Sequence, residues 1–303
     1  MTSLKIVIAG ASGLLGRALV ARLEGQNHAV TRLVRPSADL GGNQVVWDPA
    51  NGVLDQAALE GADAVICLNG ANLADHRWTP KFKRVLIDSR VQPTGLLART
   101  MARLVVKPKV FLVASGIAVY GDRGDDWMTE ESGHGQGFLV KLTQDWEGAA
   151  LAAVEARIRV VNLRIGPVLA ADGGALGKML LPFKLGLGGR LGSGKQYMPW
   201  IAFEDCLDAM MFCIHQKSLV GPVNLVSPNP VPNAVFTKAM GKVLSRPTLF
   251  PMPAFALRLG FGQIADEALL ASCRAKPAKL LDVGFNFRYP QVFEALEQQL
   301  SSP

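Results

Sequence analysis

The chain has 303 residues, of which 49% are hydrophobic and 19% charged, with a net charge of +7 and no low-complexity run, which excludes a disordered or repetitive protein. Lysine and arginine are spread along the whole chain, so we expect no nucleic-acid partner. No apolar run reaches the ~18 residues of a membrane span, and the four cysteines form neither a C-x-x-C pair nor a disulfide framework. We therefore expect a soluble, cytoplasmic protein with no membrane partner and no metal site.

Short apolar runs rich in β-branched residues alternate with amphipathic stretches over the first 165 residues. The candidate strands cover residues 4–9, 29–34, 44–47, 64–68, 109–115 and 158–165, and the clearest helical patterns cover 14–24, 80–104 and 138–154. Continuously apolar strands are typical of a parallel sheet that is covered on both faces. This alternation predicts an α/β fold built on a doubly wound parallel sheet, in which ligands bind at the carboxyl ends of the strands.

A glycine-rich turn, Gly10-Ala11-Ser12-Gly13-Leu14-Leu15-Gly16, follows the first strand and opens the first helix. In such a motif the first glycine makes the tight turn, the second lets a pyrophosphate approach the backbone, and the third allows the helix to pack closely on the strand. The amino terminus of the helix offers free N–H groups and a partial positive charge to the phosphates. The turn therefore predicts a dinucleotide-binding site.

The end of the second strand indicates which dinucleotide binds. An acidic residue there would accept hydrogen bonds from the adenosine ribose and select NAD. The chain instead reads Arg32-Leu33-Val34-Arg35-Pro36, with no carboxylate. A guanidinium group can pair with a ribose 2′-phosphate through two hydrogen bonds. We therefore predict NADP as the cofactor and Arg35 as the phosphate ligand, with a solvated surface arginine as the alternative.

After Gly166-Pro167 the sequence becomes richer in glycine and proline. Residues 172–200 are glycine-rich, and short helical patterns follow at 233–244, 254–261, 264–272 and 291–300, while 204–216 and 222–226 are expected to return to the large sheet. We therefore predict a dinucleotide-binding domain over residues 1–225, with 172–200 contributing to the lobe that forms the pocket. A small, mostly helical C-terminal lobe is expected over residues 226–303.

Several segments together resemble a known superfamily. The glycine spacing of the first turn, Val119-Tyr120-Gly121 and the run from Asn162 to Pro167 resemble the extended short-chain dehydrogenase/reductases. The chain is most similar to their atypical epimerase-family branch, on the strength of Arg77-Trp78, Ser89-Arg90, Asp145-Trp146-Glu147, Gly173 through Trp200, Gly284-Phe285 and Phe287 through Pro290. The resemblance covers nearly the whole chain. It implies an NADP(H)-binding Rossmann domain with a small C-terminal domain, in proteins often labelled nucleoside-diphosphate-sugar epimerases.

The resemblance also implies a set of cofactor contacts. It places the phosphates at Gly10, Ser12, Gly13, Leu14 and Leu15, and the adenosine and ribose at Val34, Arg35, Leu68 and Asn69. Further contacts would come from Val85 and Arg90 on the long helix at 80–104, and from Val168 near the nicotinamide. For Val85 and Val168, ordinary core packing is the alternative.

The Tyr-x-x-x-Lys pair that performs the superfamily's chemistry is absent from the helix after the fifth strand. In that pair the lysine lowers the pKa of the tyrosine, so that the phenol can exchange a proton with a carbonyl or an alcohol. The corresponding positions hold Leu139 and Thr143, and Lys141 lies between them at the wrong offset. Neither Leu139 nor Thr143 can act as an acid or a base, so the catalytic residues stay unassigned.

Four other residues are candidates for a substrate pocket: Ser115, Tyr120, Lys178 and Trp200. Ser115 ends the fifth strand one residue away from the usual register of the helper hydroxyl. Tyr120 is equally well explained as a packed aromatic side chain. Lys178 and Trp200 lie in the glycine-rich segment.

Two functions agree with these features. The first is an NADP(H)-dependent oxidoreductase or epimerase that acts on a small polar or nucleotide-sugar-like substrate with non-standard acid and base groups. The second is a non-catalytic NADP(H)-binding regulatory protein, since some members of the branch carry cell-division-inhibitor labels.

Overall fold

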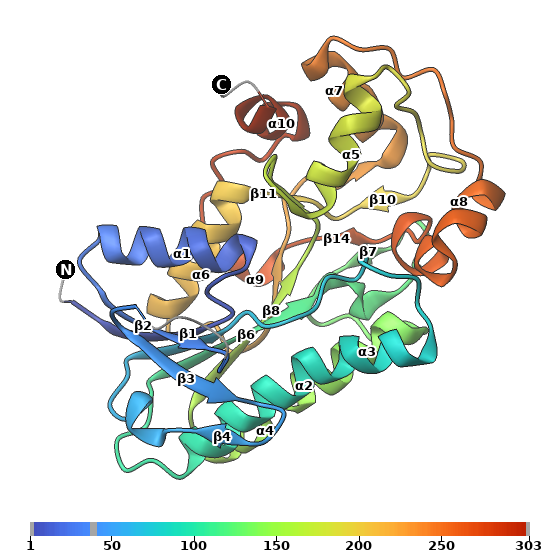
Figure 1. Cartoon of the computed structure of the whole chain (residues 1–303). Helices are drawn as coiled ribbons and strands as arrows, with labels where there is room; N and C mark the ends of the chain where they lie inside the picture. The colour runs from blue at the N-terminus through green and yellow to red at the C-terminus, as the bar shows by residue number, and fades with distance from the viewer. Residues whose placement is uncertain (1–2, 37–40, 301–303) are drawn as a thin grey trace.

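The computed structural model describes residues 3–36 and 41–300 (Figure 1). These residues build an eight-stranded sheet in the order β12-β8-β6-β5-β1-β2-β3-β4. Its strands are β1 (Lys5–Ala9), β2 (Ala29–Val34), β3 (Gln44–Asp48), β4 (Val53–Leu54), β5 (Ala64–Cys67), β6 (Val110–Gly116), β8 (Arg159–Ile165) and β12 (Gly221–Leu225). Neighbouring strands are parallel, apart from the antiparallel pair of β3 and β4. The predicted doubly wound α/β sheet is therefore confirmed, and the six predicted strands agree with it closely.

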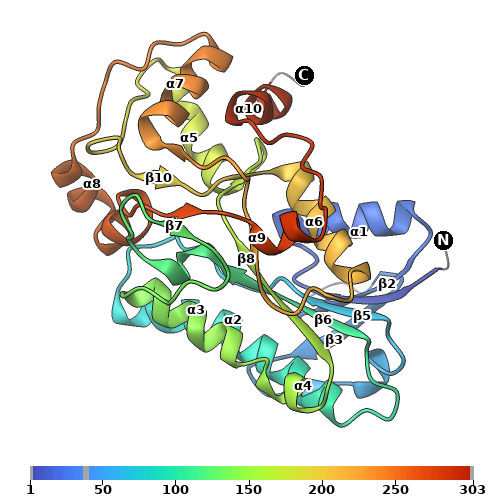
Figure 2. The ribbon, with the colours of Figure 1, turned by 180° about the vertical axis from the view of Figure 1, so that it is seen from behind.

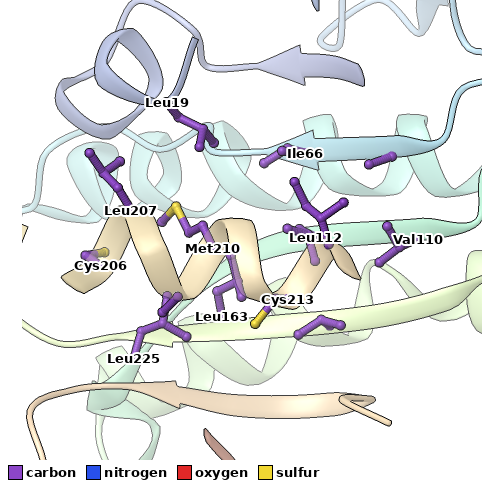
Figure 3. Close-up of a cluster of buried hydrophobic side chains, with 14 of the residues drawn as sticks. Leu19, Ile66, Val110, Leu112, Leu163, Cys206, Leu207, Met210, Cys213 and Leu225 are labelled. Carbon is purple, nitrogen blue, oxygen red and sulfur yellow. The ribbon is translucent and has the colours of Figure 1, made fainter. Parts of the chain in front are cut away.

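Helices cover both faces of this sheet. One face carries α1 (Leu14–Gly25) and α6 (Phe203–His215), and the other carries α2 (Pro80–Ala102), α3 (Phe138–Gly148) and α4 (Leu151–Glu155) (Figures 1 and 2). Figure 3 shows the core under α1 and α6, where Leu19 and Met210 face side chains of the sheet such as Leu112. This double cover explains why the strands are continuously apolar.

The order of the strands creates a crevice in the middle of the sheet. From β1 the chain winds through β2 to β3, whereas from β5 it winds in the opposite direction through β6 to β8. The connections that leave the adjacent strands β1 and β5 therefore diverge at their carboxyl ends. In open α/β sheets, ligands bind at this kind of reversal.

A small lobe sits beyond the carboxyl ends of the strands. It contains α5 (Gly174–Lys184), α7 (Asn233–Leu244), α8 (Ala254–Phe261), η3 (Ala265–Leu269) and α10 (Val292–Leu300). Between η3 and α10, α9 (Ala278–Asp282) returns to the sheet domain and buries Leu280 in the core beside β12. Short strand pairs join it to the sheet domain: β9 (Val168–Leu169) with β11 (Ile201–Ala202), β10 (Tyr197–Met198) with β13 (Val231–Pro232), and β7 (Trp127–Met128) with β14 (Arg274–Ala275). Two short helices, η1 (Gln56–Ala58) and η2 (Ile117–Tyr120), complete the elements.

The glycine-rich segment contains a helix that the sequence did not indicate. α5 forms despite Gly177 and Pro182, because Leu176 and Phe183 are buried in the core of the small lobe. That core also contains Trp200 and Phe236, so the packing outweighs the poor helix propensity of the segment. Within residues 3–36 and 41–300, no helix combines the length and the apolar composition that a membrane crossing needs.

Candidate functional site

The glycine turn between β1 and α1 lies at the central crevice. Gly10 has a φ of +82°, and a Cβ at this position would lie 2.7 Å from the carbonyl carbon of Leu68. A Cβ at Gly16 would overlap the carbonyl oxygen of Gly10. At Gly13 the nearest atom to an added Cβ is 3.4 Å away, which is ordinary packing distance. The fold itself thus requires glycine at positions 10 and 16, whereas no protein neighbour requires it at position 13.

The amino terminus of α1 is open to an anion. Among the described residues, no side chain caps this end of the helix, and its first turn contains no acidic residue. The N–H groups of the first turn have no partner within the helix, and the helix dipole adds a partial positive charge there. Ser12, Leu14 and Leu15 belong to this end, so the predicted phosphate contacts lie together.

A cleft of about 180 Å³ extends from this turn toward the end of β2. Its lining comes from four segments that are distant in sequence: Gly10, Ala11, Ser12, Leu33, Val34, Arg35, Trp47 and Asn69. Arg35 is exposed, whereas Trp47 on β3 is fully buried apart from its edge at the cleft. Sequence reasoning missed Trp47, because only the pairing of β3 with β2, with Val46 opposite Val34, brings it to the cleft.

The loop after β5 forms the opposite wall of the crevice. The N–H of Leu68 donates to the carbonyl of Ala9 at 2.9 Å, and Asn69 lines the cleft beside Gly10. Leu68 and Asn69, which the resemblance assigns to the cofactor, therefore lie directly beside the glycine turn.

Arg90 supports this loop from below. Its Nη2 donates to the carbonyl of Ala71 at 2.9 Å, its Nη1 donates to the carbonyl of Leu86 at 3.0 Å, and its guanidinium stacks on the ring of Trp146. Burial lowers the pKa of Arg90 to about 10, so it stays charged at neutral pH. Arg90 therefore holds the backbone of residues 70–71 in position beside the crevice.

The other two predicted cofactor residues lie further from the turn. Val85 is on α2 with its side chain half-exposed, and Val168 begins the short strand β9, where it pairs with Ile201. Leu14 reaches toward the small lobe, since an added Cβ at Gly173 would lie 3.5 Å from its side chain. The first turn of α1 thus meets the segment that leads into α5.

The four candidate residues for a substrate pocket are not brought together. The Ser115 hydroxyl donates to Glu147 at 2.6 Å, and the Tyr120 hydroxyl donates to Asn224 at 2.8 Å, both from buried positions. Trp200 is in the core of the small lobe, with its indole N–H on the carbonyl of Asn229. Lys178 is exposed on α5 and donates to the carbonyl of Ala74 at 3.1 Å.

Ser115 and Tyr120 belong to a buried ion-pair network. Arg164 donates to both carboxylate oxygens of Glu147 and, at 3.0 Å, to the hydroxyl of Tyr120. Burial by itself lowers the pKa of Arg164, but its hydrogen bonds to Glu147 and the charge of that carboxylate outweigh burial and raise it. Burial also raises the pKa of Tyr120 to about 12. At neutral pH this network holds a fixed ion pair and a neutral phenol.

The positions of the usual catalytic pair are packed rather than open to a substrate. Leu139 lies in an apolar cluster with Trp78, Leu86, Leu142 and Ile264. The Thr143 hydroxyl donates to the carbonyl of Leu139 at 2.8 Å, within the helix. Neither side chain presents a group that exchanges protons.

A second cleft, of about 100 Å³, lies where α3 meets the small lobe, and Leu139 and Glu267 are part of its lining. Glu267, on η3, accepts a hydrogen bond from the N–H of Leu139 at 2.7 Å and so caps the start of α3. Sequence reasoning missed Glu267, because this contact joins residues 128 positions apart. Among the described residues, no group of three or more His, Cys, Asp or Glu side chains is placed to hold a metal ion.

Comparison with known proteins agrees with this architecture. The model of the "NAD dependent epimerase/dehydratase family" matches residues 6–225, and that of a "Domain of unknown function (DUF1731)" matches residues 252–299. An epimerase family protein from Mycobacterium leprae is 43% identical over 98% of this chain and 96% of its own length. The human epimerase family protein SDR39U1 is 32% identical over 97% of this chain and 99% of its own length.

Two solved structures extend the likeness to three dimensions. The crystal structure of human SDR39U1 (isoform 2) with NADPH matches with a TM-score of 0.90 and 30% identity, covering 99% of this chain and 100% of that one. The structure of the nucleoside-diphosphate sugar epimerase from Corynebacterium glutamicum matches with a TM-score of 0.83 and 34% identity, covering 99% of this chain and 58% of that one. The chain therefore belongs to the NAD-dependent epimerase/dehydratase family.

Proposed function

We propose that this chain binds NADP(H) in the cleft between the glycine turn and Arg35. The observation that carries the proposal is the convergence of an open helix N-terminus, a Gly13 that no protein neighbour explains, and an exposed arginine at the end of β2. Turn and helix fit a pyrophosphate, and Arg35 fits a 2′-phosphate. The NADPH in the related human SDR39U1 structure supports the same choice.

We further propose that the protein is a cytoplasmic oxidoreductase or epimerase that acts on a small polar or nucleotide-sugar-like substrate. Bound NADP(H) would supply hydride transfer, and the crevice between β1 and β5 would hold its phosphates and orient it along the sheet. The name of the related Corynebacterium glutamicum protein supports the substrate class. Proton transfer would have to use groups other than residues 139 and 143.

The alternative is an NADP(H)-binding regulatory protein without turnover. This alternative is favoured because Leu139 and Thr143 are buried and neither side chain can act as an acid or a base. Without such a pair, the rate of the reaction is lower by a factor of roughly 10²–10⁴. In this case NADP(H) binding would change how the small lobe is positioned relative to the sheet domain. The contact between Leu14 and residues 173–174 would transmit the change.

The decisive experiment measures binding and turnover on the same preparation. NADPH binding is titrated by fluorescence, and epimerisation or reduction is assayed against nucleotide sugars and simple carbonyls. Turnover that falls in Ser115→Ala, Tyr120→Phe or Lys178→Ala would support an enzyme in which that side chain has a role. Turnover that survives all three changes together would exclude these three residues from catalysis, and tight binding with no turnover on any substrate would favour the regulatory protein.

A further inference from the structure

Two long segments of this protein contain no acidic residue, and the net positive charge is concentrated there. Residues 173–203 and 209–265 contain no aspartate or glutamate, yet together they contain nine lysines and arginines. The rest of the chain has 23 basic and 25 acidic residues, so these two segments account for the whole net charge of +7. Both segments contribute to the small lobe, through α5, α7 and α8. The electrostatic potential around the lobe is therefore positive, although lysine and arginine are spread evenly along the sequence.

The same lobe exposes large apolar side chains. On α5, Leu181 and Leu185 are 66% and 64% exposed, and on α8, Phe255 and Leu259 are 71% and 76% exposed. Each pair is spaced by four residues, so it lies along one face of its helix. Between the helices, Leu249 and Phe250 are 78% and 58% exposed. We call the six side chains the apolar surface: Leu181, Leu185, Leu249, Phe250, Phe255 and Leu259.

Hydrogen bonds join the segments that carry this surface. The Arg246 Nε donates to the carbonyl of Lys184 at 2.9 Å, at the end of α5. The N–H of Met252 donates to the carbonyl of Arg190 at 2.9 Å, just before α8 begins. Figures 1 and 2 show α5 beside α7, and α8 at a separate edge of the small lobe, to which the chain that follows α7 leads. Lys184, Arg190 and Arg246 belong to these same segments, and Arg258 on α8 pairs with Asp266 on η3.

We propose that this surface docks the protein on a membrane that contains anionic phospholipid. Protruding leucine and phenylalanine side chains enter the boundary between headgroups and acyl chains, while neighbouring lysine and arginine side chains attract anionic headgroups. A second copy of the chain is a poor occupant, because the acid-free segments of its own lobe would bring like charges together. A nucleic acid uses the cations but gives exposed leucines no role. Such docking differs from the expectation of no membrane partner, which rested on the absence of an apolar run long enough to span a membrane.

The test is vesicle co-sedimentation of the full-length protein saturated with NADPH. We expect it to sediment with vesicles of phosphatidylcholine and phosphatidylglycerol, less at about 1 M than at about 0.15 M salt, and not with phosphatidylcholine alone. The double variant Phe255→Ser with Leu259→Ser should weaken this binding roughly tenfold or more, since each buried apolar side chain contributes at least that factor. Lys184→Glu with Arg190→Glu should also weaken it, and only at low salt.

A matched control lies at the other end of the molecule. Val105 is 93% exposed, and Val105→Ser with Lys107→Glu changes an apolar and a basic side chain before β6, far from the small lobe. This variant should bind vesicles like the wild type, and all variants should keep their melting temperature and NADPH affinity. Equal or absent binding to the two vesicle types would overturn the proposal. So would a dimer that Phe255→Ser with Leu259→Ser dissociates, or binding to duplex DNA without binding to vesicles.

Discussion

The glycines of the first turn differ in what a side chain would meet, and this difference separates folding from binding. At Gly16 an added Cβ overlaps the backbone of Gly10, so nothing flexible can move aside. At Gly13 the backbone φ of −73° suits any residue, and the added Cβ has ordinary neighbours. A substitution at position 13 therefore reports on a ligand, whereas one at position 16 reports on the fold.

We expect Gly13→Val to lower the free energy of unfolding by no more than about 1 kcal/mol, the scale of a changed helix cap. It should abolish the rise in melting temperature that NADPH gives the wild type, because the side chain occupies the approach of the pyrophosphate. Gly16→Ala serves as the contrasting variant and should cost about 1–3 kcal/mol of stability through overpacking. Wild-type NADPH affinity in Gly13→Val would show that the turn has only a structural role. Thermal unfolding with and without NADPH measures both variants.

We expect Arg35 to set the preference between NADP(H) and NAD(H). Arg35→Ala should weaken NADPH binding by about 1.5–3 kcal/mol, the range of a hydrogen bond to a charged group, and leave NADH binding nearly unchanged. Arg32→Ala is the matched control on the same strand, since Arg32 pairs with Glu24 on α1. Calorimetric titration with both cofactors tests this. Equal losses for NADPH and NADH would contradict the assignment.

The raised pKa of Tyr120 makes the free energy of unfolding depend on pH in the alkaline range. Its pKa is about 12 in the folded protein and about 10 in the unfolded chain, so between these values only the unfolded state loses the proton. The stabilisation by the neutral phenol is therefore complete below pH 10 and is lost as the pH rises toward 12, by roughly 2–3 kcal/mol in total. In denaturant titrations, the gap in stability between wild type and Tyr120→Phe should shrink across this range. A gap that stays constant to pH 12 would argue against a buried, hydrogen-bonded phenol.

At the scale of elements, α3 depends on the small lobe for its first turn. Glu267 accepts the N–H of Leu139, and an added Cβ at Gly137 would lie only 3.0 Å from the same carboxylate. Through this contact, η3 of the small lobe is attached to the first turn of α3 in the sheet domain. This is the helix on which the superfamily carries its catalytic pair, so the lobe fixes its position relative to the crevice.

Glu267→Ala should lower the free energy of unfolding by about 1 kcal/mol, the typical effect of losing a helix cap. The control is Asp266→Ala on the same element, whose pair with Arg258 is solvent-exposed and contributes little. Urea denaturation followed by circular dichroism compares the two. If Glu267→Ala is no less stable than Asp266→Ala, the carboxylate does not cap α3.

Local sequence patterns were sufficient to predict the elements that form the sheet. They were insufficient to predict elements and site residues that depend on contacts with distant parts of the chain. The six main strands of the first domain and the glycine turn are encoded within short runs of neighbouring residues, so they could be predicted. α5 could not, because its glycine and proline residues argue against a helix and only Leu176 and Phe183 in the lobe core stabilise it. Trp47 and Glu267 at the two clefts depend on contacts between segments far apart in sequence, which carry no local signal.

At the scale of the whole molecule, the two parts of the chain are electrically unlike. The sheet domain is nearly neutral, and the lobe beyond its carboxyl edge is cationic and free of acids over two long segments. An anionic cofactor that enters the crevice therefore approaches between a helix N-terminus and a positive lobe, which raises its rate of association. The same field orients the lobe toward any anionic surface, so that cofactor entry and surface attachment share one source of attraction.

The small lobe is discontinuous in sequence, and this has a consequence for synthesis on the ribosome. α5 emerges before β12 completes the sheet, but α10, which packs with α7 in the same core as α5, emerges roughly a hundred residues later, about 5–20 s at ordinary translation rates. Until then Leu176, Phe183 and Trp200 have no complete core to enter. The carboxylate of Asp205 likewise lacks its partners until late in synthesis, because in the finished protein it accepts hydrogen bonds from the backbone N–H groups of Arg288 and Tyr289. A nascent chain stalled after β12 is thus a natural client for chaperones that hold exposed apolar segments.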